Sequence, residues 1–579
     1  MSDEPLSLAA ATSRMTAPGQ AFELEDRLVG GETMTVWKHA PSTLRDVFEM
    51  TLRHGDRDFL VYDEQRITFD VHYRRAATLS HHLAEAGVRA GDRVAIASRN
   101  LPDWVSAYWG VVTMGAIAVP LNAWWSSDEL RYGLVDSGAR VLFVDEERLE
   151  RVRPLFDALT DLEYAIVLSP GTPDVAPLGA TGRVRVLAFD EFLGAVDREA
   201  KPIDAAIDPD DDATIFYTSG TTGRPKGAVA THRNISTNLM NLFFIGQRTS
   251  LRFGDEPANA TAYPTANLLN IPLFHATGCL AIMVVNAAAG GRLVMMHHFD
   301  AGRALAIVER ERITAIGGVP TVVMQLLDHP DFNRFDTSSV RLVSYGGAPA
   351  PPELVRRIKE AFQLAQPGNG YGLTETAAAV ALNNGSDYVE RPSSCGPAVP
   401  VCRVAVVPDD YDGDEPPAPS GPEQVGELWI KGPNVVRGYW NKPEETARSF
   451  TRGWLHTGDI GRIDDDGFIY IVDRAKDMII RGGENIYSIA VEAALFEHPD
   501  VADCAVVGLP HPVLGEEVAA VIVVRPGRTL RAEELSQHVR HRLAHYEVPT
   551  RYFFRGEPIP RNPQGKVLKT VLRESLRAD

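Results

Sequence analysis

Short apolar runs alternate with helix-like stretches between residues 73 and 145, and this alternation limits the fold more than any other feature of the sequence. The expected strands are residues 93–98, 117–120 and 141–144, and the helical stretches around them reach to Ala90, cover 104–114 and begin at Ser127. Strands and helices in alternation are typical of layered parallel α/β sheets. With 579 residues, 44% of them hydrophobic, the chain is long enough to bury several cores.

Four later segments complete the expected organisation. Residues 206–212 are a solvated linker before an apolar strand at 214–217, and residues 351–362 place apolar side chains on one helical face. Residues 408–424 are rich in Pro, Gly and Asp and predict an exposed loop, and the strand-rich stretch after it predicts a small antiparallel unit. A separate α/β segment follows Asp473. We therefore predict two domains, 1–473 and 474–579.

The charge balance excludes some classes of partner. The chain holds 58 Lys and Arg against 77 Asp and Glu, a net charge of −19, which argues against a general nucleic-acid or anionic-membrane binder. Residues 474–579 are distinct, with 15 basic against 14 acidic residues. Four cysteines without a CxxC pair fit a reducing compartment, and we expect the cytoplasm, with no signal peptide and no transmembrane segment.

The strongest local signal is the sequence YTSGTTGRPKG at residues 217–227. Its glycines let the backbone approach a ligand closely, its hydroxyl and N–H groups can surround phosphate oxygens, and Lys226 adds a point charge. It is not a Walker loop, because Lys226 is followed by Gly. The alternative interpretation is a flexible surface loop. The residues that would bind phosphate are Thr218, Ser219, Gly220, Thr221, Thr222, Gly223 and Lys226.

Residues 368–376, GNGYGLTET, form a second glycine-rich segment. The glycines do not have the spacing of a dinucleotide fingerprint. The turn is followed by a hydroxyl and a carboxylate, Thr374 and Glu375, which suit a hard cation such as Mg²⁺. The alternative is that Thr374 and Glu375 cap the start of a helix.

Three more segments combine charged residues with glycine-containing turns. Asp459 follows a Gly turn in residues 454–460, where it could receive two sugar hydroxyls, and a surface turn explains it equally well. Residues 473–485 combine a charged joint with the paired glycines Gly482 and Gly483, and Lys566 follows a Gly in residues 561–567. Each segment alone could be an ordinary solvated loop.

Taken together and in this order, the motifs resemble those of the acyl-adenylate-forming superfamily, which includes acyl-CoA and aryl-CoA synthetases. The resemblance covers residues 40–575 and rests on the segments 218–227, 346–349 (GGAP), 371–375 (YGLTE), 426–432 (GELWIKG), 457–459 (TGD), 473–474 (DR) and 565–566 (GK). It implies a large N-terminal domain of layered α/β sheets with a small β-barrel-like subdomain, followed by a small mobile α+β C-terminal domain.

The resemblance also implies a two-step reaction. ATP and a carboxylic acid give acyl-AMP and pyrophosphate, and the thiol of coenzyme A (CoA) then takes the acyl group. By similarity, residues 218–223 and Lys226 hold the β- and γ-phosphates, and Thr218 and Glu375 ligate Mg²⁺. The remaining nucleotide residues would be Gly347, Ala348, Asn369, Gly370, Tyr371, Gly372 and Thr374, with Asp459 and Arg474 on the ribose. Lys566 would reach the substrate carboxylate and the α-phosphate as the catalytic cation.

Relatives carry out the second step after their C-terminal domain rotates about a hinge, here Lys476 by position. Gly482 and Gly483 would then border the pantetheine tunnel, and Gly346 would lie at the substrate site. One departure concerns the C-terminal domain, because Ser488 stands where Pro is usual and Ala490 where Glu is usual. This departure leaves the nucleotide residues untouched and concerns only the packing of the C-terminal domain.

The acid is expected to be hydrophobic. No Asp or Glu occurs in residues 257–299, so an α-amine would lack a partner, and residues 271–283 are apolar with small side chains. His275 lies in a PLFH pattern and is assigned to the substrate site, not to a general base, because a carboxylate needs no deprotonation near neutral pH. We therefore expect an acyl-CoA synthetase for a medium- or long-chain fatty acid or a similar carboxylate.

Two alternatives stay open at this point. A stand-alone ligase could load an acyl carrier protein, because a carrier presents the same phosphopantetheine thiol as CoA. A non-catalytic acyl- or nucleotide-binding protein is the other, although the retained Glu375, Asp459, Arg474 and Lys566 count against it. The oligomeric state, for which a homodimer is one option, is also open.

Overall fold

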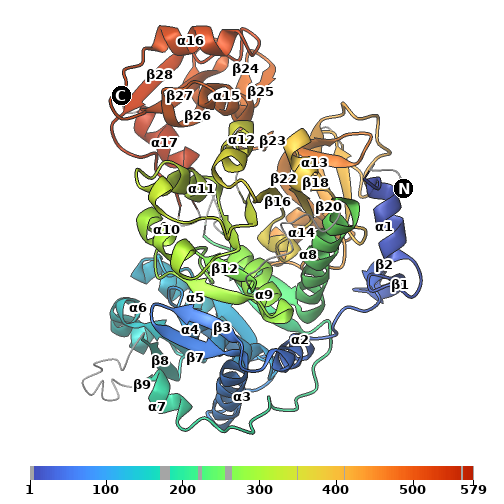
Figure 1. The fold of residues 1–579 in the computed structure, drawn as a ribbon, viewed down its shortest axis with the longest axis vertical. Helices are drawn as coiled ribbons and strands as arrows, with labels where there is room; N and C mark the ends of the chain where they lie inside the picture. The colour runs from blue at the N-terminus through green and yellow to red at the C-terminus, as the bar shows by residue number, and fades with distance from the viewer. Residues whose placement is uncertain are drawn as a thin grey trace.

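The computed structural model describes residues 5–169, 183–218, 224–253, 264–347, 350–409, 411–562 and 565–577. Within these ranges the chain forms two large sheets, a smaller antiparallel sheet and a C-terminal sheet (Figure 1). A two-stranded ribbon, β1 (Leu24–Val29) with β2 (Glu32–Trp37), lies near the N-terminus.

The first large sheet has seven strands. Its order is β11 (Gly227–Thr231), β10 (Asp212–Tyr217), β6 (Ile117–Pro120), β5 (Arg93–Ala97), β7 (Val141–Asp145), β8 (Tyr164–Leu168) and β9 (Arg185–Ala188). All neighbours are parallel except β10 and β11. The expected parallel α/β layering is confirmed, although the helix expected to reach Ala90 ends at Glu85, because Gly87 turns the chain with φ +92°.

The second large sheet has eight strands. Its order is β17 (Ala381–Asn384), β16 (Gln366–Tyr371), β15 (Leu342–Gly346), β14 (Ala315–Gly318), β12 (Ala266–Leu269), β13 (Arg292–Met295), β3 (Asp58–Tyr62) and β4 (Gln65–Thr68). From β16 to β3 every pair is parallel, so the carboxyl ends of β16, β15, β14 and β12 meet at one edge. In sheets of this kind, ligands bind beyond that edge.

Both large sheets are buried on two faces by helices. Alternate residues of β5 belong to different cores, since Val94 and Ile96 face one hydrophobic cluster and Ala95 and Ala97 face another. The shared central layer contains α3 (Phe69–Glu85), α4 (Pro102–Val112) and α9 (Val284–Ala289). The outer layers contain α5 (Ser127–Ser137) and α6 (Glu146–Val152) on one side, and α10 (Ala301–Arg310), α11 (Pro320–Leu327) and α12 (Pro352–Ala361) on the other.

The expected antiparallel unit is a six-stranded sheet beside the long helix α8 (His232–Phe253). Its strands are β18 (Gly396–Pro397), β23 (Phe468–Arg474), β22 (Trp454–Ile463), β20 (Gly426–Lys431), β19 (Arg403–Val407) and β21 (Phe450–Thr451). The shorter helices are α1 (Leu8–Thr16), α2 (Leu44–Met50), α7 (Phe189–Leu193), α13 (Gly385–Glu390) and α14 (Pro443–Ser449).

The C-terminal sheet is built from residues after β23. Its order is β25 (Glu484–Ile486), β24 (Ile479–Arg481), β27 (Gly515–Val524) and β26 (Val501–His511), with β28 (Arg551–Arg555) paired to β27. Helices α15 (Ser488–Phe496) and α16 (Ala532–Arg540) cover one face, and α17 (Lys569–Arg577) covers the other. The domain boundary at residues 473 and 474 falls at the end of β23 and stays a prediction.

Candidate active site

The expected phosphate loop joins two antiparallel strands. Thr218 directly follows β10 and Lys226 directly precedes β11, and the Thr218 N–H donates to the Lys226 carbonyl over 2.8 Å. This pairing closes the base of the loop. Ser219, Gly220, Thr221, Thr222 and Gly223 lie outside the described residues.

Tyr439 connects Lys226 to Glu375, and the sequence analysis did not identify it. Its hydroxyl donates to Glu375 Oε1 over 2.8 Å, and its ring centroid lies 4.9 Å from Lys226 Nζ. Burial and the Glu375 charge hold the pKa of Tyr439 above its usual value, so the phenol stays protonated and donates. The phosphate lysine and the candidate Mg²⁺ carboxylate therefore share one aromatic side chain, the first over its ring and the second at its hydroxyl.

At the ends of β15 and β16 glycine is required, because neighbouring backbone leaves no room for a side chain. A Cβ on Gly346 would lie 2.6 Å from the Gly370 carbonyl oxygen, and one on Gly372 would lie 1.5 Å from that of Ala378. Gly347 has φ +73°, and the Asn369 amide is buried against Cys395. Ala348 lies outside the described residues.

The helix-cap interpretation of Thr374 and Glu375 is wrong. A short 3₁₀ turn does cover Thr374–Thr376, but the hydroxyl that accepts the N–H of the preceding residue, Leu373, belongs to Thr376, over 2.9 Å. The Glu375 carboxylate is held by Tyr439 instead, while its backbone carbonyl accepts the Val436 N–H over 2.9 Å. Glu375 is thus presented beyond the carboxyl end of β16.

Asp459 is a buried strand residue, so the surface-turn interpretation is wrong. It lies in β22, only 6% exposed, directly after Gly458, whose φ of +68° accompanies a shift of register against β20. Asp459 Oδ1 accepts the Arg474 Nε–H over 2.5 Å, and Oδ2 accepts the Tyr371 hydroxyl over 2.9 Å. A β-bulge thereby re-aims a carboxylate toward the carboxyl end of β16, a usual role for bulges beside active sites.

Lys566, in the loop between β28 and α17, lies where the charges of Asp459 and Arg474 act on it. Its pKa is lowered to about 8, first because burial disfavours the ammonium and second because Arg474 repels it, while Asp459 acts in the opposite direction. Lys476 also contributes repulsion, and burial lowers its own pKa. The structure therefore brings together Lys566, Asp459, Arg474 and Lys476, which the sequence spreads over more than a hundred positions.

The Lys566 loop is held by hydrogen bonds within the loop and by packing against the large N-terminal part of the chain. Asn562 Oδ1 accepts the Lys566 N–H over 2.9 Å, and Arg561 donates to the Gly565 carbonyl over 2.7 Å. A Cβ on Gly565 would lie 2.7 Å from Val319 Cγ2, at the start of α11. The loop thus packs against the carboxyl edge of the second large sheet.

His275 precedes a π-helical segment, Thr277–Met283, that follows β12. Burial lowers the pKa of His275 to about 4, so the ring is neutral near pH 7 and brings no charge to a carboxylic acid. Ile282, in the π-helix, lies 3.5 Å from the position of a Cβ on Gly317. Gly278 is small for a backbone reason, because a Cβ there would lie 2.2 Å from the Pro272 carbonyl oxygen. The segment is positioned as an apolar wall beyond β12 and β14.

Gly482 and Gly483 do not join this group. They form the β24–β25 hairpin turn with φ +62° and +90°, both exposed. In the structure the neighbour of a Cβ on Gly482 is Leu514, from the same sheet, at 3.5 Å, and Gly483 has none within 4 Å. The predicted tunnel role of this pair stays a prediction.

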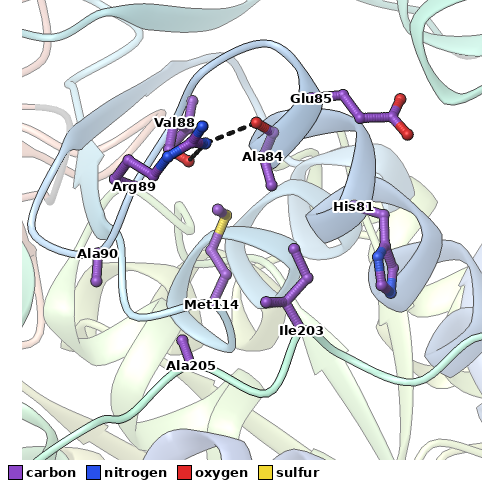
Figure 2. A pocket seen from close by; sticks show the side chains of 9 residues that line it. All are labelled: His81, Ala84, Glu85, Val88, Arg89, Ala90, Met114, Ile203 and Ala205. Carbon is purple, nitrogen blue, oxygen red and sulfur yellow. Dashed lines mark hydrogen bonds between the residues drawn. The ribbon is translucent and has the colours of Figure 1, made fainter.

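A cavity of 460 Å³ lies elsewhere, between α3 and the segment before β10 (Figure 2). Its lining includes His81, Met114, Ile203 and Arg89, whose guanidinium donates to the Ala84 and Val88 carbonyls at 2.7 and 2.9 Å. None of the residues assigned to nucleotide or acid lines it. This cavity plays no part in the site.

The chain belongs to the AMP-binding enzyme family. Residues 48–440 match the family described as AMP-binding enzyme, and residues 490–566 match the AMP-binding enzyme C-terminal domain. The resemblance to acyl-CoA synthetases of the acyl-adenylate-forming superfamily and the expected fold class are both confirmed. The chain is an ATP-dependent acid–thiol ligase. The alternative of a non-catalytic binding protein is therefore not retained.

Several known proteins are similar over most of the chain. A feruloyl-CoA synthase from Amycolatopsis sp is 37% identical over 86% of this chain and 92% of its own length. The long-chain-fatty-acid–CoA ligase FadD13 of Mycobacterium tuberculosis is 34% identical over 86% of this chain and 90% of its own. The crystal structure of the anthranilate CoA ligase AuaEII with anthranoyl-AMP has a TM-score of 0.80 at 25% identity, covering 93% of this chain and 98% of that one.

Among the described residues, no helix combines the length and apolar character that crossing a bilayer requires.

Proposed function

We propose that this protein activates a hydrophobic carboxylic acid in two steps, forming acyl-AMP and pyrophosphate from ATP and then acyl-CoA and AMP. The observation that carries the proposal is that the Lys566 loop packs beside α11, where the charges of the hydrogen-bonded pair Asp459 and Arg474 act on the Lys566 ammonium. The C-terminal part thus supplies a cation near a carboxylate and a guanidinium at the carboxyl edge of the large sheet. Attack on a phosphorus centre needs positioning and charge neutralisation of this kind.

The residues divide into three groups in the proposed reaction. Thr218, the loop 219–223 and Lys226 hold the distal phosphates, with Gly347, Ala348, Asn369, Gly370, Gly372 and Thr374 around the rest of the nucleotide. Asp459 and Arg474 receive the ribose hydroxyls, with Tyr371 fixing the Asp459 carboxylate. Lys566 neutralises charge where the acid oxygen attacks the α-phosphate.

The donor set fits Mg²⁺. No group of three or more His, Cys, Asp or Glu side chains that could enclose a metal occurs among the described residues. Mg²⁺ in nucleotide sites takes one or two protein oxygens and completes its shell with phosphates and water. Glu375, a carboxylate at the edge of the sheet, and the Thr218 hydroxyl would supply those oxygens, and the ion would offset the phosphate charge.

The acid is proposed to bind along the π-helical segment and the ends of β12 and β14. A neutral His275 and an apolar Ile282 favour a hydrophobic acid. Relatives named for feruloyl-CoA and for long-chain fatty acids support an aryl acid and a fatty acid alike. The medium- or long-chain fatty acid expected from the sequence therefore stays one of two proposed classes.

CoA is the proposed acceptor, because the similar proteins are named as CoA synthases and ligases. A carrier-protein thiol would be the alternative acceptor. A homodimer and a cytoplasmic location stay predictions.

Acid-dependent release of pyrophosphate from Mg-ATP tests the first step, and the same assay with CoA or with a pantetheinylated carrier protein tests the second. We expect pyrophosphate release to depend on a hydrophobic acid and to become multiple-turnover only with CoA. Multiple turnover with the carrier protein alone would overturn the acceptor, and no acid-dependent pyrophosphate with fatty or aryl acids would overturn the proposal.

A further inference from the structure

Tyr439 contacts both of the opposite charges that the proposed reaction needs. Its hydroxyl is bonded to the Glu375 carboxylate over 2.8 Å, and the Lys226 ammonium lies 4.9 Å from its ring centroid. The two contacts differ in kind, since the carboxylate accepts a hydrogen bond and the ammonium makes a cation–π contact. One side chain thus contacts both groups.

The backbone around Tyr439 is held in place from both sides. The Trp440 N–H donates to the Gly227 carbonyl over 2.7 Å, and the Val229 N–H donates to the Gly438 carbonyl over 3.1 Å, which attaches this segment to β11. On the other side, the Val436 N–H donates to the Glu375 carbonyl over 2.9 Å. The segment 436–440 therefore ties β11, and so Lys226, to the turn that carries Glu375.

The side chain itself is anchored as well. The Tyr439 N–H donates to the Thr446 hydroxyl over 2.9 Å, and the ring packs edge-on against Phe450, with centroids 5.8 Å apart. A ring fixed in this way loses little further entropy when a ligand arrives. The hydroxyl and the ring suit different partners, because the hydroxyl donates a hydrogen bond to a carboxylate and the ring face attracts an ammonium.

We propose that Tyr439 is a positioning residue that keeps Glu375 and Lys226 apart and ready for a divalent cation and a polyphosphate. If the two charges were free to meet, they would pair, and each ligand would first have to break that pair. The hydroxyl leaves one Glu375 oxygen, Oε2, for the metal, and the ring leaves the Lys226 N–H donors for phosphate. This inference rests on the proposed function, because it assigns both groups to metal-bound ATP.

Two substitutions separate the two contacts. Tyr439→Phe keeps the ring and removes the hydrogen bond to Glu375, so binding of metal-bound ATP should weaken by about tenfold or more, as for loss of a hydrogen bond to a charged group. Binding of ATP without a metal should change by less than about twofold, since Lys226 keeps its ring contact. Tyr439→Leu removes both contacts and should weaken both kinds of binding.

The measurement is an isothermal calorimetric titration of the full chain with ATP, carried out once with Mn²⁺ and once with EDTA. Electron paramagnetic resonance counts the bound Mn²⁺ in parallel. A matched control is Tyr470→Phe, which removes a phenol–carboxylate hydrogen bond to Asp464 of 3.0 Å in the antiparallel sheet. We expect this control to bind both forms of ATP as the unchanged protein does.

The outcomes distinguish the inference from the proposed function. Equal losses with and without metal in Tyr439→Phe, or unchanged binding in that variant, would overturn the positioning role while leaving the ligase intact. A melting temperature in Tyr439→Phe close to that of the unchanged protein would exclude misfolding as the cause of a loss. If the unchanged protein bound no ATP in either form, the proposed function and the inference would both fall.

Discussion

For the single residue Lys566, the surroundings in the fold change how readily the side chain carries its positive charge. Burial and the neighbouring Arg474 make its positive charge costly in the free protein, which lowers its pKa to about 8. The same cost makes the ammonium ready to receive an anionic partner, because a polyphosphate and a carboxylate would relieve it.

Replacing this ammonium should slow the first step selectively. We expect Lys566→Ala to lower acid-dependent acyl-AMP formation by on the order of 10²-fold or more, the scale for losing one transition-state donor. The fold should persist, since the loop is held through Arg561 and Asn562. The measurement is pyrophosphate release, with Lys359→Ala, at an exposed position of α12, as the matched control. Near-normal adenylation by Lys566→Ala would contradict the assigned role.

The pH dependence of the first step should report the protonation state of Lys566. With a pKa of about 8 in the free protein, Lys566 is charged below that pH and loses its proton above it, so kcat/KM for adenylation should fall as the pH rises through about 8. In Lys566→Arg the guanidinium stays charged, so this alkaline limb should disappear even if the rate is lower. A limb at the same pH in both proteins would assign the titration to another group.

At the scale of elements, the joint between β23 and α15 is built on a buried carboxylate. Asp473, 1% exposed, accepts the Ser488 hydroxyl over 3.1 Å and the Arg474 N–H over 2.8 Å, and the Ser488 N–H also donates to it. Lys569 of α17 donates to Ser488 over 2.7 Å and pairs with Glu492 over 2.8 Å. Ser488, which departs from the family pattern, therefore links the end of β23 to two helices of the C-terminal sheet.

Ser488→Pro tests this joint by introducing the residue that is usual in the family. Ser488 is the first residue of α15, and Tyr487 before it is extended with φ −86° and ψ 112°, so proline fits the backbone. The loss of the N–H and hydroxyl bonds to buried Asp473 should still lower the free energy of unfolding by about 1–3 kcal/mol. Chemical denaturation measures it, and Ser575→Ala, at an exposed site on α17, should change little. A stability equal to that of the unchanged protein would show that the network is redundant.

The elements that could be predicted from sequence are those in which local pattern and burial agree. The strands at 93–98, 117–120 and 141–144 and the helix at 351–362 form where apolar spacing expects them. For Asp459 the sequence predicts a position after a Gly turn, with a surface turn as the alternative, whereas pairing with β20 and β23 continues the strand through a bulge. Tyr439 could not be recognised, because its partner Glu375 is reached only through the fold. The motif at 473–474 is visible in the sequence, but the hydrogen bond from Ser488 to Asp473 depends on the fold.

At the scale of the whole molecule, the C-terminal part meets the large part beside α11 (Figure 1). Asp328, just after α11, pairs with Arg525 of the C-terminal part over 3.5 Å, with both side chains partly exposed. Gly565 packs on Val319 nearby. This arrangement suits the first step, since it places Lys566 where the charges of Asp459 and Arg474 act on it, while the Gly482–Gly483 turn stays exposed.

A cross-link across this contact should therefore separate the two steps. In a double variant, Asp328→Cys with Arg525→Cys, a bifunctional thiol reagent would join the two parts, and selectively so because the four native cysteines are all buried. We expect the cross-linked protein to form acyl-AMP and to fail in passing the acyl group to CoA, while the same variant without reagent does both. Full acyl-CoA formation after cross-linking would show that the second step needs no rearrangement of this contact.

We propose that the site with Lys566, Asp459 and Arg474 makes an acyl-AMP from a hydrophobic acid and passes the acyl group to CoA. The most direct measurement is mass spectrometry of the products after incubation with Mg-ATP, CoA and a mixed panel of straight-chain, branched, aromatic and ring-bearing carboxylic acids. The account predicts a new acyl-CoA together with AMP and pyrophosphate, strongly reduced in Lys566→Ala. ATP consumed without any acyl-AMP or acyl-CoA, or products equally abundant in Lys566→Ala, would contradict it.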